Sequence, residues 1–248
     1  MSAYGPLCQQ FYDADKPRPD DAELAWYLDR LPRDAGPVLE PMCGSGRLLV
    51  PLAERGFAMH GVDTSAAMLG ACRARLAAAG LAATLVRQDT AVLNLPFRYG
   101  AAFVAAGSFQ LLADPAHARS ALARIHAHLV PPRMLLLDLH VPDAALHPPG
   151  AAAVEVRSVR DAGGTRITLR SESTVDRDAR LLSMQIRYER RGPGGAIERE
   201  DEALAITWYD EAEITALLES VGFDDVAIEP PAWPRDARGF GVRATASR

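Results

Sequence analysis

Between residues 38 and 139 the sequence repeats one arrangement: a short apolar run, a loop with glycine or polar residues, and a segment of helical periodicity. Strands are predicted to begin at Val38–Leu39 and to cover Ala58–Val62, Ala83–Arg87, Phe103–Ala106 and Met134–Leu139, with helices at Arg47–Arg55, Ala66–Ala79 and Ala116–Leu129. Continuous apolar strands are typical of a parallel sheet covered on both faces. Strands alternating with helices therefore predict an α/β fold.

From residue 154 the periodicity changes to two, which predicts an antiparallel meander. Its strands are expected at Val154–Arg160, Thr165–Val175, Leu181–Arg190 and Ile197–Thr207, and the α/β pattern resumes with a helix at Glu211–Val221 and a hairpin of Val226–Glu229 and Gly241–Ala246. We therefore expect an N-terminal helical cap (1–35), an α/β domain (36–150 and 210–248) and an antiparallel insertion (151–209). The insertion is expected to serve as a substrate surface, a dimer surface or both.

The composition argues against several classes of protein. A net charge of −5 gives no basic field for nucleic acid, and the arginines between residues 157 and 199 alternate with glutamates. No apolar run approaches the roughly 20 residues of a membrane span, and the N-terminus lacks the pattern of a signal peptide. Cys8, Cys43 and Cys72 are too few for a disulfide framework or a zinc site. We expect a cytoplasmic protein that binds no metal, nucleic acid or membrane.

Polar residues and glycines follow the first three predicted strands. Gly44 and Gly46 let the backbone approach a ligand, and a helix that starts after Gly46 presents unpaired N–H groups. Asp63 follows the second strand and suits a ribose diol, while Gln88 and Asp89 follow the third and suit an exocyclic amine. Because parallel strands end at one edge of the sheet, these residues predict an adenosine site there.

Two classes of cofactor contain adenosine and compete for such a site. A dinucleotide site needs the pattern G-x-G-x-x-G, and the third glycine is missing after Gly46. Glu40, just before the loop, would repel a pyrophosphate but would tolerate a ligand with an ammonium group. S-adenosylmethionine carries an ammonium group and no phosphate, so it is favoured.

Residues 38–112 resemble the class I S-adenosylmethionine-dependent methyltransferases. Val38–Gly46 is similar to the first motif of that family, with Met42 in place of its first glycine. Gly61–Ser65 with Met68–Leu69, then Gln88–Thr90, then Ala105–Leu112 are similar to the next three motifs, in the family's order. The resemblance implies a Rossmann-like, seven-stranded, mostly parallel sheet with helices on both faces and an antiparallel insertion after strand five.

The resemblance also implies roles for single residues. Asp63 would bind the ribose hydroxyls, Thr64 and Met68 would flank the adenine, and Asp89 would accept from the adenine amino group. Backbone carbonyls of the segment from Ala105 would meet the methionyl ammonium. The expected cofactor-binding residues are Glu40, Met42, Cys43, Gly44, Gly46, Arg47, Asp63, Thr64, Met68, Gln88, Asp89, Thr90 and Ala105.

The expected reaction is an in-line methyl transfer to oxygen or nitrogen of a small molecule. The enzyme mainly aligns the acceptor and excludes water, although a hydroxyl acceptor also benefits from a general base. His140, at the end of the fifth strand, is the first candidate for a base or an orienting group, and Tyr12 in the cap is the second. The expected acceptor-binding residues are Phe109, Gln110, His140 and Trp208.

Other functions stay open at this point. The main alternative is a non-catalytic protein that binds S-adenosylmethionine or acts as a partner subunit, and a nicotinamide-dependent oxidoreductase is less favoured. A methyltransferase acting on macromolecules is disfavoured because Gly107–Gln110 stands where an Asn/Asp-Pro-Pro-aromatic segment would be. The apolar positions of the insertion favour a homodimer.

Overall fold

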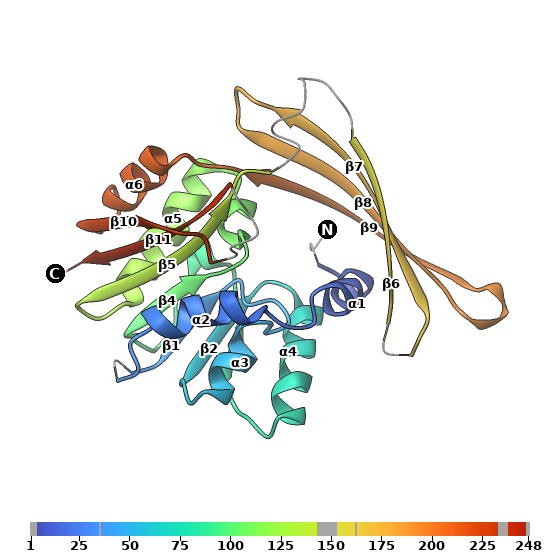
Figure 1. The fold of residues 1–248 in the computed structure, drawn as a ribbon, viewed down its shortest axis with the longest axis horizontal. Coiled ribbons are helices and arrows are strands. Elements are labelled where there is room, and N and C mark those ends of the chain that lie inside the picture. Colours follow the sequence, from blue (N-terminus) through green and yellow to red (C-terminus); the bar gives the residue numbers. More distant parts are fainter. Residues whose placement is uncertain (1–3, 35, 143–152, 162, 233–237, 247–248) are drawn as a thin grey trace.

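The computed structural model describes residues 4–34, 36–142, 153–161, 163–232 and 238–246, and its strands form two separate sheets (Figure 1). A seven-stranded sheet has the order β10-β11-β5-β4-β1-β2-β3, and a four-stranded sheet has the order β6-β7-β8-β9. The strands of the larger sheet are β1 (Val38–Pro41), β2 (Met59–Asp63), β3 (Thr84–Arg87), β4 (Ala101–Val104), β5 (Arg133–His140), β10 (Asp225–Glu229) and β11 (Gly239–Ala246). Those of the smaller sheet are β6 (Ala153–Arg160), β7 (Arg166–Asp176), β8 (Leu181–Arg191) and β9 (Ile197–Thr207).

The larger sheet is parallel from β3 to β5. Parallel pairing joins β1 to β2 and β4, β2 to β3, and β4 to β5, whereas β11 runs antiparallel to both β5 and β10. The predicted seven-stranded, mostly parallel sheet and its closing hairpin are therefore confirmed. As a result, the carboxyl ends of β1 to β5 lie along one edge.

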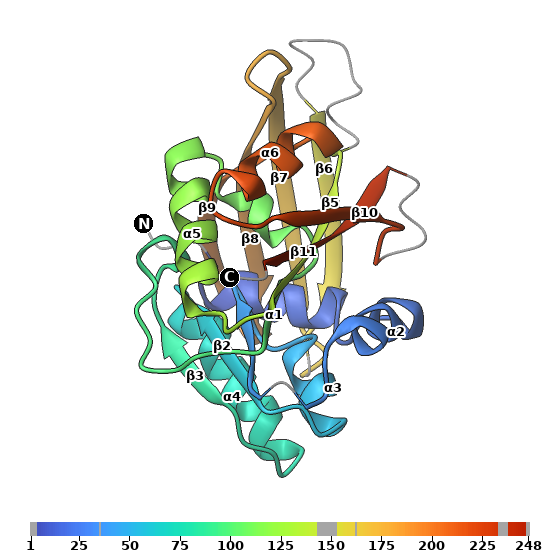
Figure 2. The same ribbon diagram turned by 90° about the vertical axis from the view of Figure 1, so that its left-hand side faces the viewer.

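Helices cover both faces of the larger sheet, as expected for strands that are apolar on both sides (Figure 2). On one face, α2 (Asp21–Arg30), α3 (Leu49–Glu54) and α4 (Ala66–Ala78) pack through residues such as Leu52 and Leu69. On the other face, α5 (Pro115–His128) and α6 (Glu211–Glu219) pack through residues such as Leu122 and Leu218. The two cores hold the edge of the sheet in place from both sides.

Two predicted element boundaries at this edge were wrong, both because of left-handed backbone. The helix after the glycine loop begins at Leu49 and not at Arg47, since residues 44–48 form turns with positive φ at Gly44 and Gly46. The Val50 N–H already donates to Gly46 O (3.0 Å), so fewer N–H groups face outward than expected. Strand β4 ends at Val104, because Ala106 (φ 54°) and Gly107 (φ 67°) leave the extended conformation.

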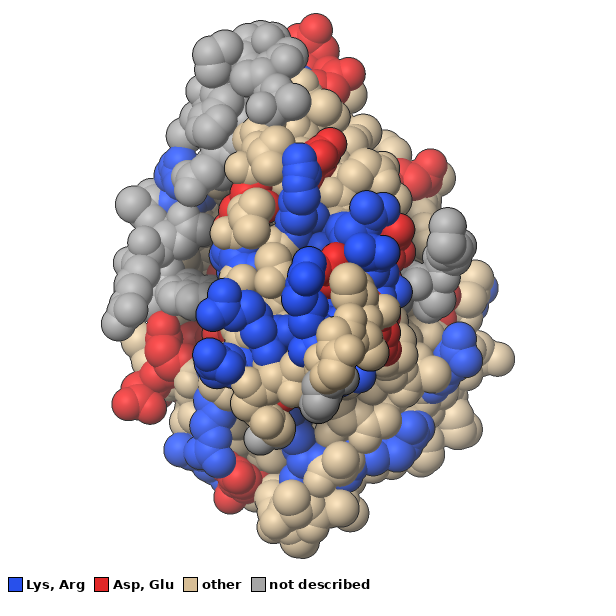
Figure 3. Space-filling model, turned by 90° about the vertical axis from the view of Figure 1, so that its right-hand side faces the viewer, with Lys and Arg blue, Asp and Glu red and all other residues tan. Residues whose placement is uncertain are grey.

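The smaller sheet is an antiparallel meander, as predicted. Its outer face carries basic side chains interleaved with acidic ones (Figure 3), including the pairs Arg187–Asp201 (2.6 Å) and Arg199–Glu189 (3.1 Å). Its inner face is apolar at Ile167 and Ile186. The meander therefore has one apolar, buried face and one charged, solvated face.

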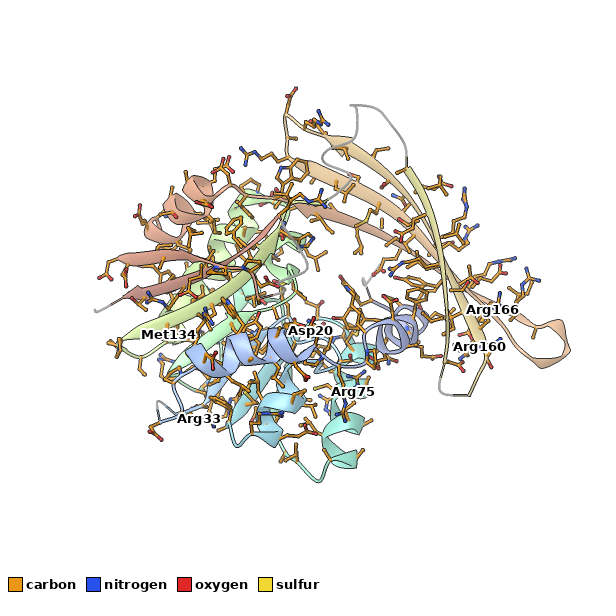
Figure 4. The ribbon with its side chains drawn as sticks, viewed as in Figure 1. Asp20, Arg33, Arg75, Met134, Arg160 and Arg166 are labelled. Atoms are coloured by element: carbon orange, nitrogen blue, oxygen red, sulfur yellow. The ribbon has the colours of Figure 1, made fainter. Side chains whose placement is uncertain are left out.

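The predicted cap consists of two helices, of which α1 (Pro6–Asp15) lies between the smaller sheet and α4 (Figure 1). Leu7 and Phe11 pack against the inner face of the sheet. Asp13 pairs with Arg75 of α4 (2.8 Å; Arg75 is labelled in Figure 4) and accepts from Ser45 Oγ in the glycine loop (2.5 Å). Helix α1 therefore joins the two sheets over the edge where β1 and β2 end.

Candidate cofactor and acceptor site

A cavity of about 370 Å³ lies at the carboxyl edge of the larger sheet. Every residue predicted to bind the cofactor contributes to its wall except Gly46, and Tyr12 of α1 contributes as well. Ala203–Ala205 of β9 form part of the opposite side. The strand-end motifs therefore meet in one place, and α1 and the smaller sheet close it.

The two loop glycines serve different purposes. A Cβ on Gly46 would lie 2.6 Å from Cys72 Sγ, so Gly46 lets the loop pack on α4. A Cβ on Gly44 would meet nothing nearer than Met68 Sδ at 4.0 Å, so the backbone there is open to a ligand. Met42, which replaces a glycine of the motif, has φ 59°, a conformation that costs a non-glycine residue about 1–3 kcal/mol. The loop holds this strain at the cavity wall.

Asp63 links the second strand to the glycine loop. Its carboxylate accepts from the N–H groups of Gly44 (2.9 Å) and Ser65 (2.8 Å). Burial raises the pKa of Asp63, and these backbone donors oppose that shift. The carboxylate is therefore fixed at the cavity wall with lone pairs left for a pair of hydroxyl groups.

Glu40 is the strongest indication of what the cavity binds. The side chain is buried, and its Oε2 atom has no hydrogen-bond partner among the described residues. Burial raises the pKa of Glu40 well above its ordinary value. A buried carboxylate without a partner is unfavourable, and a ligand ammonium would supply both the charge and the donors that it lacks. The cavity thus fits the amino-acid end of S-adenosylmethionine.

Arg47 does not supply the missing hydrogen-bond partner of Glu40 Oε2, because its guanidinium is bound to another carboxylate. Its guanidinium donates two hydrogen bonds of 2.6 Å to Glu23 of α2, and both side chains are buried. Tyr12 also interacts with Arg47, and burial raises the pKa of the Tyr12 phenol. A phenol with a raised pKa stays protonated at neutral pH and cannot take up a proton, which favours an orienting role for Tyr12 over proton removal.

Asp89, which follows the third strand, has a hydrogen-bond partner that the sequence analysis did not predict. Asp89 accepts from the Ala91 N–H (2.8 Å), and both of its oxygens also face His117 Nε2, at 3.0 and 3.1 Å. His117 lies in the first turn of α5 and lines the cavity, but sequence spacing gave no signal for it. An adenine amino group at Asp89 would share the carboxylate with this imidazole.

The loop after β4 is held by Asp138 of β5. The Asp138 carboxylate accepts from the backbone N–H groups of Ala106 and Ala232, and its carbonyl oxygen accepts from Gly107 N–H (3.1 Å). Burial raises the pKa of Asp138 to about 7. Ala105 and Ala106 line the cavity, so Asp138 fixes the backbone that faces a bound cofactor.

The four predicted acceptor residues lie beside the cavity, and none of them is among its described wall residues. Gln110 is buried: its amide nitrogen donates to the carbonyl oxygens of His140 (2.7 Å) and Thr207 (2.8 Å), and its oxygen accepts from His140 N–H (2.9 Å). Phe109 is buried in the core. The His140 ring packs on Gly107, where a Cβ would lie 2.5 Å from it. Gln110 is thus a brace between β5 and β9.

Tyr4 is a cavity residue that sequence reasoning missed. It has φ 62°, and its backbone is held from two directions, because Tyr4 N–H donates to Glu202 of β9 and Ser65 Oγ donates to Tyr4 O (2.5 Å). Burial raises its pKa well above the ordinary value. Only the tertiary structure brings Tyr4 and Ala203–Ala205 to the cavity.

Comparison with known proteins identifies the class. A family model described as "Methyltransferase domain" matches residues 38–132. The dTDP-3-amino-3,6-dideoxy-alpha-D-glucopyranose N,N-dimethyltransferase of Streptomyces fradiae is 27% identical over 201 residues, which cover 81% of this chain and 75% of that protein. The chain is an S-adenosylmethionine-dependent methyltransferase. The predicted enzyme class and cofactor are confirmed.

Solved structures show the same fold for this methyltransferase. An S-adenosylmethionine-dependent methyltransferase from Clostridium acetobutylicum has a TM-score of 0.76 at 16% identity and covers 96% of both chains. The sugar N-methyltransferase KedS8 from Streptoalloteichus has a TM-score of 0.74 at 21% identity and covers 100% of this chain and 97% of its own. Both likenesses include the four-stranded sheet, because they extend over nearly the whole chain.

When bound, S-adenosylmethionine supplies a methyl group on a positively charged sulfur. Glu40 would hold its ammonium group, Asp63 its ribose hydroxyls and Asp89 its adenine amino group. The backbone of Ala105 and Ala106, fixed by Asp138, would orient the methionyl end. Helix α1 and β9 cover the cavity and exclude water, which leaves alignment of the acceptor as the enzyme's main task.

Proposed function

We propose that this methyltransferase transfers methyl groups to an amino group on a sugar. The observation that carries the proposal is the 201-residue similarity to a dimethyltransferase of an amino sugar, because it extends well beyond the 38–132 methyltransferase domain. Helix α1 and strand β9, which contribute to the wall of the cavity, lie outside that domain. The sugar N-methyltransferase KedS8 has the same fold over the whole chain, which is consistent with the proposal.

The chemistry of the cavity also favours nitrogen as the acceptor atom. A neutral amine needs no general base to attack a methyl group, whereas a hydroxyl group benefits from one. The imidazole among the described wall residues is His117, and it is bound to Asp89 at the predicted adenine end. Tyr12, with its raised pKa, stays protonated at neutral pH and so cannot serve as the base. We propose that Tyr12, which lines the cavity, orients the amino group and that no strong base is needed; His140 lies outside the described wall of the cavity.

The proposal is tested by mass spectrometry with a matched pair of acceptors. The enzyme is incubated with S-adenosylmethionine and either dTDP-3-amino-3,6-dideoxyglucose or its 3-hydroxy counterpart. We expect one or two methyl groups on the amino sugar and none on the hydroxy sugar. Equal methylation of the hydroxy sugar, or no transfer to any amino sugar by protein that binds S-adenosylhomocysteine, would contradict the proposal.

Assembly and location stay predictions. Among the described residues, no helix combines the length and apolar character needed to cross a bilayer. Val154 and Val156 on the outer face of the smaller sheet are 57% and 61% exposed, and they support the homodimer predicted from the sequence. Light scattering at micromolar concentration tests that prediction, and a monomer would contradict it. Fractionation of the producing cells tests the predicted cytoplasmic location.

A further inference from the structure

Strand β9 lies at one edge of the smaller sheet and, among the described strands, pairs with β8 alone. Its other edge faces the larger sheet (Figure 1), where it contacts η2 (Ser108–Leu111), the short 3-10 helix after β4. The backbone N–H and C=O groups along the unpaired edge of a strand are open to a further partner. The open edge of β9 therefore offers hydrogen bonds that the sheet itself does not use.

Gln110 shows which residues of β9 point to the open edge. It belongs to η2, on the side of β9 away from β8, and its amide nitrogen donates to Thr207 O at 2.8 Å. The pairing of β9 with β8 keeps one register from Ile197 to Thr207, so no bulge interrupts the alternation. In an antiparallel strand the N–H and C=O groups of one residue point to the same side, and residues two apart point alike. The backbone groups of Ala205 and Ala203 therefore point to the open edge, as Thr207 O does.

This stretch of the open edge lies at the cofactor cavity. Ala203 and Ala205 belong to the cavity wall, and their side chains are single methyl groups that let a ligand approach the backbone. The carboxylates of β9 serve the start of the chain instead, because Glu200 accepts from the first turn of α1 and Glu202 accepts from Tyr4 N–H. The part of β9 that lines the cavity is therefore uncharged backbone.

The open edge at the cavity is short. Gln110 occupies the Thr207 carbonyl at one end, and Asp201, the next residue that points the same way beyond Ala203, lies outside the described wall. From Ala203 to Ala205 a strand rises by about 7 Å. That length suits a single ring with hydroxyl groups, which donate and accept as backbone groups do. An extended peptide would need a longer edge to pair as an additional strand.

Building on the proposed function, we propose that the open edge of β9 holds the amino sugar through the backbone of Ala203 and Ala205. Their N–H groups donate to ring hydroxyl groups of the acceptor, and their C=O groups accept from these hydroxyl groups. In a 3-amino sugar, the hydroxyl groups on the two neighbouring carbon atoms flank the amino group. Holding them directs the amino group into the cavity, where Tyr12 and the cofactor residues lie.

A proline substitution on the open edge tests the assignment. Ala205→Pro removes the N–H that faces the cavity and keeps the pairing with β8, because a strand tolerates proline where the N–H points away from its neighbour. We expect the KM for dTDP-3-amino-3,6-dideoxyglucose to rise about three- to tenfold, the effect of losing one neutral hydrogen bond, and the affinity for S-adenosylhomocysteine to stay unchanged. Asp201→Pro is the matched control, because its N–H points to the same edge outside the cavity wall. An equal rise in KM in both variants would overturn the assignment.

Hydrogen exchange of single amides, measured by NMR, tests the wild-type protein without any substitution. With S-adenosylhomocysteine bound, the amides of Ala203 and Ala205 should exchange faster than those of Leu204 and Ile206, which the alternation directs to β8. Addition of the amino sugar should slow the exchange of Ala203 and Ala205. Equally slow exchange from Ala203 to Ile206 before the sugar is added would overturn the assignment.

The identity of the acceptor separates this inference from the proposed function. If the amino sugar is methylated with the same KM by the wild type and by Ala205→Pro, the edge assignment is wrong and the proposed function stands. If the 3-hydroxy sugar is methylated instead, and its KM rises in Ala205→Pro and not in Asp201→Pro, the proposed function is wrong and the edge assignment stands.

Discussion

The cofactor side and the acceptor side of this enzyme are built in different ways. On the cofactor side, the strand ends of β1 to β4 carry groups such as Glu40, which is buried, and Asp63, which accepts from the Gly44 N–H of the neighbouring loop. On the side that we propose binds the acceptor, α1 and β9 bring together residues that are more than a hundred positions apart in the sequence, as in the contacts of α1 with Glu200.

This contrast has a physical consequence for specificity. The cofactor is constant across the family, so a rigid set of buried carboxylates and strained turns suits it. The proposed acceptor side is assembled from separate segments, α1 and β9, which substitutions can change without disturbing the core of the larger sheet. We therefore expect substitutions on the cofactor side to affect stability and cofactor affinity, and substitutions on the acceptor side to affect the acceptor alone.

The largest expected effect comes from the buried ion pair on the cofactor side. Arg47→Ala leaves Glu23 buried without a partner, and we expect a loss of about 3–5 kcal/mol in the free energy of unfolding. Urea denaturation measures this loss. The control is Arg187→Ala, which removes a fully exposed ion pair from the smaller sheet and should leave the stability nearly unchanged. Equal losses in the free energy of unfolding of the two variants would contradict the view that the buried cofactor side contributes more to stability than the exposed surface.

The next largest effect is a pH dependence of the free energy of unfolding, which we expect from the buried carboxyl group of Asp138 in β5. Burial raises its pKa in the folded state to about 7 from an ordinary 3.8, so the folded state holds the proton more tightly than the unfolded state does. The free energy of unfolding should therefore fall, by up to about 4 kcal/mol, as the pH rises between these two values.

Asp138→Asn tests this assignment because the amide keeps an acceptor for the N–H groups of Ala106 and Ala232 but does not titrate. Urea denaturation should show a flatter profile for the variant than for the wild type between the ordinary value of 3.8 and the raised value of about 7. Parallel profiles for the two proteins would show that another group titrates in this range.

A smaller effect is expected where α1 meets β9. Glu200 accepts from the N–H groups of Leu7 (2.9 Å) and Cys8 (3.1 Å) and so caps the start of α1. Glu200→Ala should reduce the stability by about 1 kcal/mol, the usual effect of losing a helix cap, and should raise the KM for the acceptor. Glu198→Ala, on the exposed part of the same strand, is the control. An unchanged KM in the Glu200 variant would mean that α1 is not needed to hold the acceptor.

The cofactor side could be predicted from the sequence because its determinants are local. A polar residue directly after a buried parallel strand has to lie at the carboxyl edge, whatever the rest of the chain does. Asp63, Gln88 and Asp89 were placed in this way, and all three line the cavity. The exact start of α3 was not predicted, because it depends on how far the left-handed turns at Gly44 and Gly46 extend.

The acceptor side could be predicted only in part. Trp208 was expected to bind the acceptor and lies outside the described wall of the cofactor cavity, so its role stays a prediction, whereas Gln110 was expected there and is a buried brace. The direction of each side chain depends on where β9 packs, which no local pattern specifies. Helix α1 did have a local signal, since Pro6 stands at its first position and Leu7 and Phe11 share one face.

The most direct test of the account is the affinity for S-adenosylhomocysteine at acidic and at mildly alkaline pH, in the wild type and in Glu40→Gln. Burial raises the pKa of free Glu40, and a bound ammonium lowers it again, so binding releases a proton and the wild-type affinity should fall as the pH falls. Glu40→Gln should bind roughly ten- to a hundredfold more weakly at alkaline pH, with less dependence on pH. The exposed Glu54→Gln is the control and should behave as the wild type does. Wild-type affinity and pH dependence in Glu40→Gln would contradict the assignment of this carboxylate to the cofactor's ammonium group.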